Sequence, residues 1–292
     1  MVVEHQGALG DEAIGDFKIV ARNINHVFHI KRPGEEKRDF KAVENLNLNV
    51  KKGEFVTIVG PSGCGKSTFL DILAGLSEPT AGEIFIDGHK ISGPALDRGI
   101  VLQGYALFPW RTVRQNIEYG LEIKKVGKHE RKEISGRFID LVDLKGFEDR
   151  FPYELSGGMK QRVAIARALA YDPEVLLMDE PFAAVDAQTR EILQDELLSI
   201  WEKTGKTIIF ITHNIEEAVF LADRVAVMSP NPGAVRGILS IDLPRPRRVR
   251  DIRNSGDFSR LTGVLWNLLH GIEVSRDGDA QAVWPAINSA AL

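Results

Sequence analysis

Three glycines, a lysine and a serine occur together in the segment GPSGCGKST at residues 60–68. The segment matches G-x-x-x-x-G-K-[ST], a pattern in which the glycine backbone curls so that its N–H groups point at phosphate. Lys66 is spaced to reach the β- and γ-phosphates, and the Ser67 hydroxyl is spaced to bind Mg²⁺. The pattern predicts a site for a nucleoside triphosphate, ATP, together with Mg²⁺. The expected contacts come from Gly60, Pro61, Ser62, Gly63, Cys64, Gly65, Lys66, Ser67 and Thr68.

Two adjacent carboxylates end an apolar run in the segment EVLLMDEP at 174–181. Open α/β sheets bind their ligands beyond the carboxyl ends of such strands. We expect Asp179 to hold Mg²⁺ through water and Glu180 to orient or deprotonate an attacking water. Taken alone, the pair fits a solvated acidic strand end equally well, and the loop at 60–68 favours the functional interpretation.

Two further polar residues end apolar runs and have both a structural and a functional interpretation. Gln103 ends the run GIVLQ, either as a polar cap or as a ligand that brings its carbonyl oxygen to Mg²⁺. His213 ends TIIFITH, either as a structural residue or as a contact to the γ-phosphate. The expected position of His213 at the ligand edge of the sheet favours the phosphate contact.

Cys64 is the single cysteine of the chain, which excludes an internal disulfide and fits a reducing compartment. We interpret it as a tolerated position in the glycine loop. Because Lys66 and a helix start lie beside it, we expect the pKa of its thiol to be lowered. Alkylation of Cys64 should then inactivate the protein, and ATP should protect it.

The segment LSGGMKQR at 155–162 is typical of a helix start capped by a serine, with two glycines in the first turn. Bare backbone N–H groups and the helix dipole make such a start suitable for an anion. The chain therefore carries a second phosphate-type site, far along the sequence from the loop at 60–68.

Buried apolar runs alternate with helical patterns, which indicates an α/β fold. The run EFVTIVG at 54–60 predicts a strand buried on both faces of a parallel sheet. LNLNV at 46–50 alternates apolar and polar residues, and we expect a half-buried antiparallel strand there. Further strands are expected at 83–88, 99–103, 174–180, 207–213 and 224–228, and helices at 66–76, 113–125, 129–144 and 187–205.

The ends of the chain differ from its middle in composition. We expect a flexible N-terminus at 1–16 and an Arg/Pro-rich linker with a helical tail at 244–292. The tail predicts one amphipathic helix, and its last 20 or so residues are interpreted as weakly ordered. Arginines at 245, 247, 248, 250 and 253 suggest either a regulatory or lipid-headgroup site or a solvated linker, and we favour the linker. The predicted apolar helix positions are Phe258, Leu261, Leu265, Leu268, Leu269 and Ile272.

Charge and hydropathy exclude several classes of function. The net charge of −4 argues against a nucleic-acid partner. No apolar run approaches the roughly 20 residues that span a bilayer, and the acidic, glycine-broken N-terminus is not a signal peptide. We therefore expect a cytosolic chain that reaches a membrane only through a partner.

The order of these motifs resembles that of ABC-transporter ATPase subunits. The resemblance covers roughly 17–243, and it rests on the loop at 60–68, Gln103, LSGGMKQR, LLMDEP at 176–181, AAVD at 183–186 and His213. It implies an ATPase domain with a P-loop NTPase (RecA-like) core, an N-terminal antiparallel β subdomain and an inserted α-helical subdomain at about 112–170. It also implies that Phe28 stacks on adenine, with Phe40 as a competitor for that role; the structural alternative for Phe28 is a core residue of a strand.

The resemblance answers why there are two phosphate-type sites. It implies a head-to-tail dimer, in which Ser156, Gly157 and Gly158 of one subunit close over ATP held by Lys66 and Ser67 of the other. Asp186 matches the aspartate of the D-loop, although AAVD stands where SALD or GALD is commoner. Gln103 is followed by Gly104 instead of the usual acidic residue.

In the segment ALFPWRTV at 106–113, Phe108 and Trp110 have a structural interpretation as core residues. By resemblance, the segment belongs to the region that receives a coupling helix of a membrane permease. Its Leu-x-Pro-Trp pattern, LSGGM and the LPRPR ending are similar to importer subunits for nitrate, taurine, alkanesulfonate, bicarbonate or thiamine-precursor pyrimidines. The implied partners are a second ATPase subunit, a polytopic permease and a periplasmic or lipid-anchored solute-binding protein. The implied location is peripheral, on the cytoplasmic side of the bacterial inner (plasma) membrane.

A soluble, non-transport ABC ATPase is the alternative. Those of DNA repair or chromosome organisation insert a long coiled coil before the LSGG segment, and the interval here is too short for one.

Overall fold

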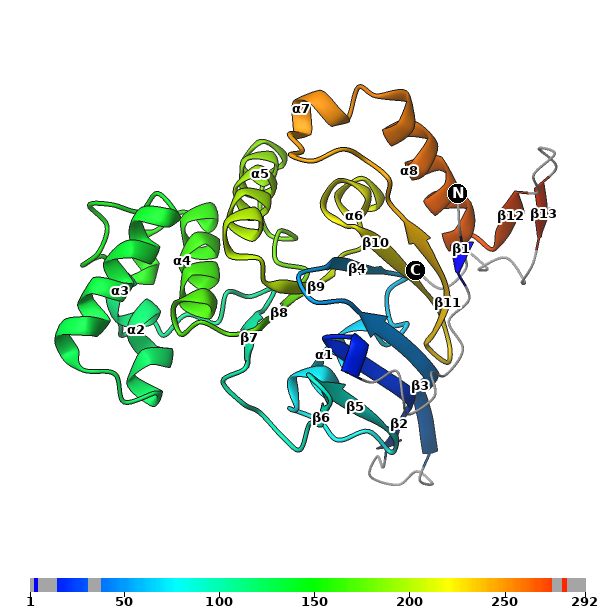
Figure 1. Ribbon diagram of the computed structural model, residues 1–292, viewed down its shortest axis with the longest axis horizontal. Helices are drawn as coiled ribbons and strands as arrows, with labels where there is room; N and C mark the ends of the chain where they lie inside the picture. The colour runs from blue at the N-terminus through cyan, green and yellow to red at the C-terminus, as the bar shows by residue number, and fades with distance from the viewer. Residues whose placement is uncertain (1–2, 5–14, 31–37, 275–279, 283–292) are drawn as a thin grey trace.

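The computed structural model describes residues 3–4, 15–30, 38–274 and 280–282 (Figure 1). Most of the N-terminal segment predicted to be flexible, 1–16, lies outside these ranges, as does most of the segment predicted to be weakly ordered at the C-terminus. In the part of the chain that is described, no helix has the length and apolar character needed to cross a bilayer.

A mixed sheet forms the centre of the molecule, in the order β1-β11-β10-β4-β9-β8-β7. Five of its strands are parallel, which confirms the prediction of a parallel sheet from the apolar runs. The parallel strands are β4 (Phe55–Val59), β7 (Arg98–Val101), β8 (Val175–Asp179), β9 (Thr207–Ile211) and β10 (Arg224–Ser229). The antiparallel edge consists of β11 (Ala234–Ser240) and β1 (Val3–Glu4), and β11 had not been predicted.

Alternate residues of the central strand β4 face two separate cores. Phe55 and Val59 pack with helices α4 (Gly157–Ala170), α5 (Ala187–Thr204) and α6 (Ile215–Leu221). Val56 and Ile58 pack on the other face, with α1 (Lys66–Ala74) and a second sheet. Because both faces are covered, β4 is apolar almost throughout.

The second sheet is antiparallel, in the order β3-β2-β5-β6. Its strands are β2 (Ile19–Ile30), β3 (Arg38–Val50), β5 (Ala81–Ile86) and β6 (His89–Lys90). The prediction that LNLNV is half-buried was wrong, because Asn47 and Asn49 are buried with their apolar neighbours. The Asn47 side chain bonds the backbone of residues 23 and 45, which satisfies its amide without water.

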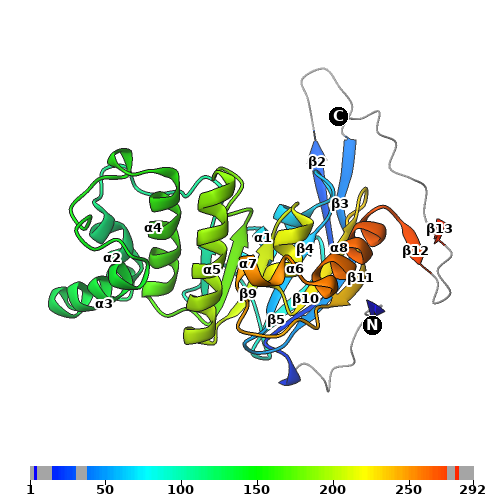
Figure 2. The same ribbon diagram turned by 90° about the horizontal axis from the view of Figure 1, so that it is seen from above.

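Three helices form a block at the end of the molecule away from the second sheet (Figure 2). They are α2 (Val113–Ile123), α3 (Lys128–Leu141) and α4, and they lie where the sequence predicted a helical subdomain. Helix α4 also packs on β7 and α5, so the block is joined to the central sheet through the LSGG helix.

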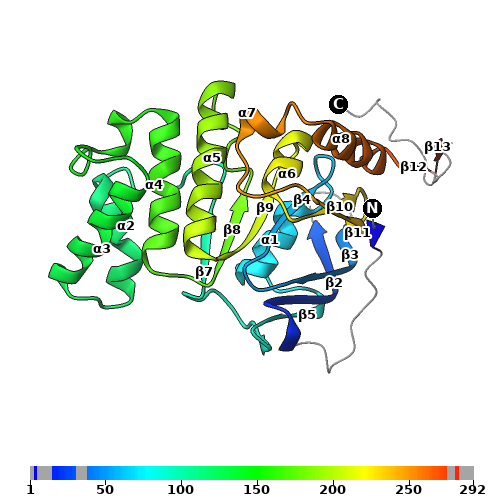
Figure 3. The ribbon, with the colours of Figure 1, turned by 45° about the horizontal axis from the view of Figure 1, so that its top comes forward.

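The C-terminal segment runs over α5 and α6 (Figure 3). It contains α7 (Val249–Ile252), α8 (Gly256–Leu269) and the short hairpin of β12 (Ile272–Val274) and β13 (Ala280–Ala282). The amphipathic helix is confirmed, with Phe258, Leu261 and Leu265 buried, but Ile272 belongs to β12 and not to the helix.

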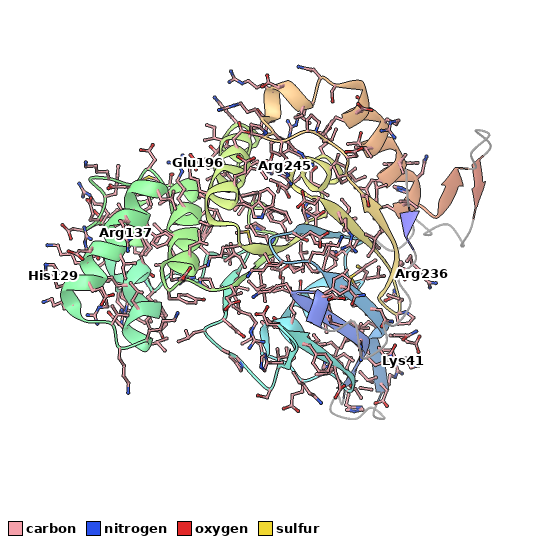
Figure 4. The ribbon with its side chains drawn as sticks, in the orientation of Figure 1. Lys41, His129, Arg137, Glu196, Arg236 and Arg245 are labelled. Carbon is pink, nitrogen blue, oxygen red and sulfur yellow. The ribbon has the colours of Figure 1, made fainter. Side chains whose placement is uncertain are left out.

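The interpretation of the arginine run as a solvated linker was wrong at two positions. Arg247 is only 4% exposed and donates to the backbone carbonyls of five residues, Val219, Phe220, Ala222, Ile241 and Leu243. Arg245, which is labelled in Figure 4, binds Asp223 at 2.7 Å and lies over the Trp201 ring. Carbonyls at the end of a helix have no partner within it, and these arginines supply donors at the end of α6.

Candidate nucleotide site

The loop at 60–68 joins β4 to α1, as its motif requires. Gly65 is the N-cap of α1 and has φ +92°, a left-handed conformation that favours glycine. A Cβ on Gly65 would lie 2.7 Å from the carbonyl oxygen of Ala42. A Cβ on Gly60 would lie equally close to the Cys64 sulfur. The glycines are therefore needed for the curl that presents backbone N–H groups at a helix N-terminus.

Lys66 is held inside the curl of the loop. Its Nζ donates to the backbone carbonyls of Gly60 at 2.9 Å and Pro61 at 3.0 Å. These two bonds give the ammonium group a fixed place among the glycine N–H groups. A cation in this place fits a triphosphate, whose oxygens need several donors at once.

A cavity of about 450 Å³ opens at this loop. It brings together three parts of the chain: the glycine loop, the carboxyl ends of β8 and β9, and the β2–β3 hairpin. The residues that line it are Phe28, Phe40, Ala42, Ser62, Gly63, Gly65, Lys66, Ser67, Thr68, Glu180 and His213.

Phe28 and Phe40 are directly opposite each other in the β2–β3 ladder, so both rings lie on the cavity side. Each is 43% exposed. The ring of His26 packs edge-on against Phe28, with 4.6 Å between centroids. The two aromatic residues that the sequence proposed as alternatives thus form one exposed apolar surface, on which an adenine ring could stack.

Asp179 is the last residue of β8 and lies beside the glycine loop. The Ser67 hydroxyl donates to its carboxylate at 3.3 Å. Burial raises the pKa of Asp179, the Glu180 charge adds to that rise, and the bond from Ser67 opposes it. Within the described residues, no three His, Cys, Asp or Glu side chains cluster as a metal site. A cation between Ser67 and Asp179 would therefore take further ligands from phosphate and water, as Mg²⁺ commonly does.

Glu180 and His213 meet at the same edge of the sheet. The Nδ1 atom of His213 lies 3.0 Å from Oε2 of Glu180. Glu180 has φ +43°, unusual for a residue with a side chain, and its N–H donates to the Ile211 carbonyl at 3.0 Å. A backbone turned in this way aims the carboxylate toward the cavity.

Nine of the predicted site residues do not line this cavity. Four of them belong to the glycine loop or to β8, namely Gly60, Pro61, Cys64 and Asp179, and the other five lie elsewhere in the chain. Gln103 lies exposed in a turn after β7, which ends at Val101, so it does not end the strand as expected. Ser156 caps α4, as predicted, by accepting from the Met159 N–H at 3.3 Å. Gly157 and Gly158 open that helix, and Asp186 caps α5.

The starts of α4 and α5 approach each other closely, since a Cβ on Gly158 would lie 2.7 Å from the Thr189 side chain. Together they present exposed polar groups of the LSGG segment and the AAVD segment. The described residues thus form a cavity suited to phosphate and, apart from it, a helix-start surface that is also suited to an anion.

The expectation of a low thiol pKa at Cys64 was wrong. The side chain is buried, and burial raises the pKa of the thiol, with the nearby Lys66 charge opposing that rise. The side chain packs in the core that contains Val56 and Ile58, and its sulfur lies 3.8 Å from Nζ of Lys66.

Hydrogen bonds that the sequence did not predict hold the segment after Gln103 in place. Tyr105 and Ala106 both have left-handed φ values, +60° and +46°. Arg167 of α4 donates to the carbonyls of both, at 2.9 and 2.5 Å. A strained backbone of this kind persists only where its surroundings hold it. The spacing of Arg167 from LSGG gave no signal of this contact.

Comparisons with known proteins identify the family of the chain. Residues 43–183 match the family model described as ABC transporter. The chain is 59% identical over 252 residues to an uncharacterized ABC transporter ATP-binding protein of Methanocaldococcus jannaschii, with 86% of this chain and 91% of that protein covered. It is 46% identical over 256 residues to the nitrate import ATP-binding protein of Synechocystis sp., covering 86% and 94%. It is 50% identical over 214 residues to an aliphatic sulfonates import ATP-binding protein of Bacillus cereus, covering 73% and 84%.

Solved structures give the same result for the fold. A dimeric bacterial ABC transporter cassette superposes with a TM-score of 0.67 at 35% identity, over 77% of this chain and all of that one. A dimeric post-hydrolysis state of an ATP-binding cassette, bound to ADP and Pi, gives 0.66 with the same identity and coverage. These likenesses confirm the predicted α/β P-loop fold.

Proposed function

Because the chain belongs to the ABC transporter family and is an ATPase subunit of the importer type, we propose that it drives uptake of a small solute through a separate membrane permease. The observation that carries this proposal is the cavity that gathers Lys66, Ser67, Glu180 and His213. Relatives named for nitrate and aliphatic sulfonates import support a solute of that kind, such as nitrate, a sulfonate or taurine, or bicarbonate. We assign residues 17–243 to the ATPase domain and 244–292 to the tail.

ATP hydrolysis requires positioning and charge stabilisation more than covalent chemistry. Lys66 and the glycine loop bind the phosphates, and Phe28, with Phe40 opposite, supplies the surface for adenine. Ser67 and Asp179, which lie 3.3 Å apart, would hold Mg²⁺, and the ion would neutralise negative charge on the phosphates. Glu180 orients the attacking water and accepts its proton, and His213 contacts the γ-phosphate from the same edge.

The exposed start of α4 supports a shared site. Ser156, Gly157 and Gly158 stand outside the cavity of their own chain, where they present donors for an anion. We propose that they close over ATP held by Lys66 of a second ATPase subunit, identical or paralogous, with Asp186 at the same interface. Two similar cassettes of known structure are dimeric.

An exposed aromatic surface on the helical block supports a permease as partner. Trp110 is 71% exposed, and Phe108 packs between it and Tyr119, with ring centroids 5.7 and 4.6 Å apart. Arg111 lies over the Phe108 and Tyr119 rings. Aromatic and arginine side chains together are typical of protein interfaces. The solute-binding protein would act on the far side of the membrane, and the ATPase would sit peripherally on its cytoplasmic face.

Purification of the tagged full chain from detergent-solubilised membranes tests the proposal. We expect a polytopic membrane protein to co-purify, and Trp110→Ala to reduce its recovery while Tyr153→Ala, also exposed and aromatic, leaves it unchanged. Recovery of the ATPase without a membrane protein would favour the soluble ABC ATPase instead. Uptake of labelled nitrate, sulfonates and bicarbonate by cells that lack the chain would then identify the solute.

A further inference from the structure

Glu217 is a buried carboxylate that the ATPase chemistry described above does not use. It lies in the first turn of α6 and is 4% exposed. Burial of a carboxylate is unfavourable unless hydrogen bonds or charges compensate for it. The residues that form hydrogen bonds to Glu217 therefore indicate which part of the structure the buried carboxylate holds in place.

Both carboxylate oxygens of Glu217 accept hydrogen bonds. Oε1 accepts from Nε2 of Gln194 in α5 at 2.9 Å, and Oε2 accepts from the Thr212 hydroxyl at 2.5 Å. The Thr212 oxygen itself accepts from the Asn214 N–H at 3.0 Å, so its own proton is directed at Glu217. Each oxygen of the carboxylate, which can only accept hydrogen bonds when it is ionised, therefore has its own donor.

These bonds fix the backbone on both sides of His213. Thr212 precedes it and bonds the Glu217 side chain, and the Asn214 side chain accepts from the Glu217 N–H at 3.1 Å. The imidazole of His213 is itself exposed and bonds Glu180. Its position therefore depends on how firmly residues 212 and 214 are held.

Gln194, the other partner of Glu217, lies in the helix that begins after the Asp186 loop. Gln194 and Arg190 belong to α5, the helix that Asp186 caps. Arg190 donates to the Val185 carbonyl at 2.9 Å. Burial raises the pKa of Glu217, while the bonds from Thr212 and Gln194 and the charges of Arg190 and His213 favour its ionised form.

We propose that Glu217 is a positioning residue for ATP hydrolysis, which holds His213 within reach of Glu180 and ties it to the helix that begins at Asp186. The inference rests on the proposed role of His213 at the γ-phosphate. A change at the Asp186 loop, where a second subunit is expected, would reach His213 through α5, Gln194 and Glu217.

Steady-state ATPase kinetics on the purified full chain test this with Glu217→Ala, His213→Ala and the double variant. Glu217→Ala should lower kcat about 10- to 100-fold and leave KM for ATP within about twofold, because misplacement of a reacting group affects the chemical step. Glu216→Ala, an exposed change one residue earlier on α6, is the matched control and should leave kcat unchanged. In the His213→Ala background, Glu217→Ala should lower kcat by less than about twofold, since both changes act through one residue.

Conservative variants separate positioning from folding. Glu217→Gln can keep both hydrogen bonds if the Gln194 amide turns over, and it should recover kcat to within a few-fold of the unchanged protein. Thr212→Val removes the bond to Glu217 and the bond from the Asn214 N–H but leaves the bond from Gln194, and it should give an intermediate kcat even if Glu217→Ala fails to fold.

Three outcomes would overturn the inference. The first is that Glu217→Ala lowers kcat by the same factor in the unchanged protein and in the His213→Ala background. The second is that the Glu217→Ala and Thr212→Val variants are soluble and folded and have a normal kcat. The third is a normal kcat in the His213→Ala variant. This result would contradict the proposed contact of His213 with the γ-phosphate, on which the role of Glu217 rests.

Discussion

His213 and Glu180 stand side by side, with Nδ1 and Oε2 3.0 Å apart, although 33 residues separate them in the chain. The contact follows from the sheet. Strands β8 and β9 are neighbours and parallel, and Asp179 pairs with Ile211 in their register. The residues that follow each strand therefore emerge at one edge, where α/β sheets bind ligands.

Replacement of Glu180 by glutamine tests its role as the base. Glutamine keeps the size of the side chain and can still bond His213, but it cannot accept a proton from water. We expect ATP hydrolysis to fall by at least about 100-fold, with ATP binding retained and a closed dimer accumulating in ATP. Phosphate release and size-exclusion chromatography measure the two effects. Turnover within about fivefold of the unchanged protein would remove Glu180 from this role.

Lys66→Ala should mainly weaken productive ATP binding. The lysine is the cation of the glycine loop, and a bond from a charged donor contributes about 1.5–3 kcal/mol. The Kd for ATP should therefore rise by about 10- to 150-fold. Titration with a fluorescent ATP analogue measures it, and Lys52→Ala, an exposed lysine before β4, is the control. An unchanged Kd would contradict the assignment of Lys66 to the phosphates.

The reactivity of Cys64 should increase with pH. Because burial raises the pKa of the thiol, the thiolate fraction near neutral pH is lower than that of an ordinary cysteine, and it increases with pH. We expect alkylation of the folded protein at about pH 7 to be at least about tenfold slower than after unfolding in urea, and slower again with ATP. Mass spectrometry of the modified chain gives both rates. Equal rates for folded and unfolded protein would show that the thiol is accessible.

Arg247→Leu should destabilise the fold. The change leaves several buried carbonyls at the end of α6 without a donor, at an estimated cost of about 2–4 kcal/mol. Chemical denaturation followed by circular dichroism measures the free energy of unfolding. Arg248→Leu, at an exposed neighbouring position, should change it by less than about 0.5 kcal/mol. Equal changes in the free energy of unfolding from the two variants would indicate that this segment is a solvated linker.

Much of the fold could be predicted because its signals are local. The apolar run of β4, the glycine loop and the serine cap of α4 lie within short segments, and each has a physical requirement that few other structures meet. The strand β11 was missed because AVRGILS is short, contains a glycine and gains its stability from pairing with β10 and β1.

The features that the sequence did not reveal depend on distant partners. The burial of Cys64 follows from how the glycine loop packs on the core, and that of Arg247 from carbonyls at the end of α6. In the sequence, nothing distinguishes Glu217 from the other charged residue of IEEAV. The two residues that donate to its carboxylate lie in α5 and after β9. Spacing along the chain carries no information of this kind.

Lys66 of one subunit and Ser156 of another are proposed to share one ATP. The most direct test mixes Lys66→Ala chains with Ser156→Arg chains, each inactive alone, and measures ATPase activity. In a homodimer, random pairing gives about half mixed dimers with one intact site each, so activity should recover to at most about a quarter of the unchanged protein. A mixture no more active than its two components, although mixed dimers form, would contradict the shared site.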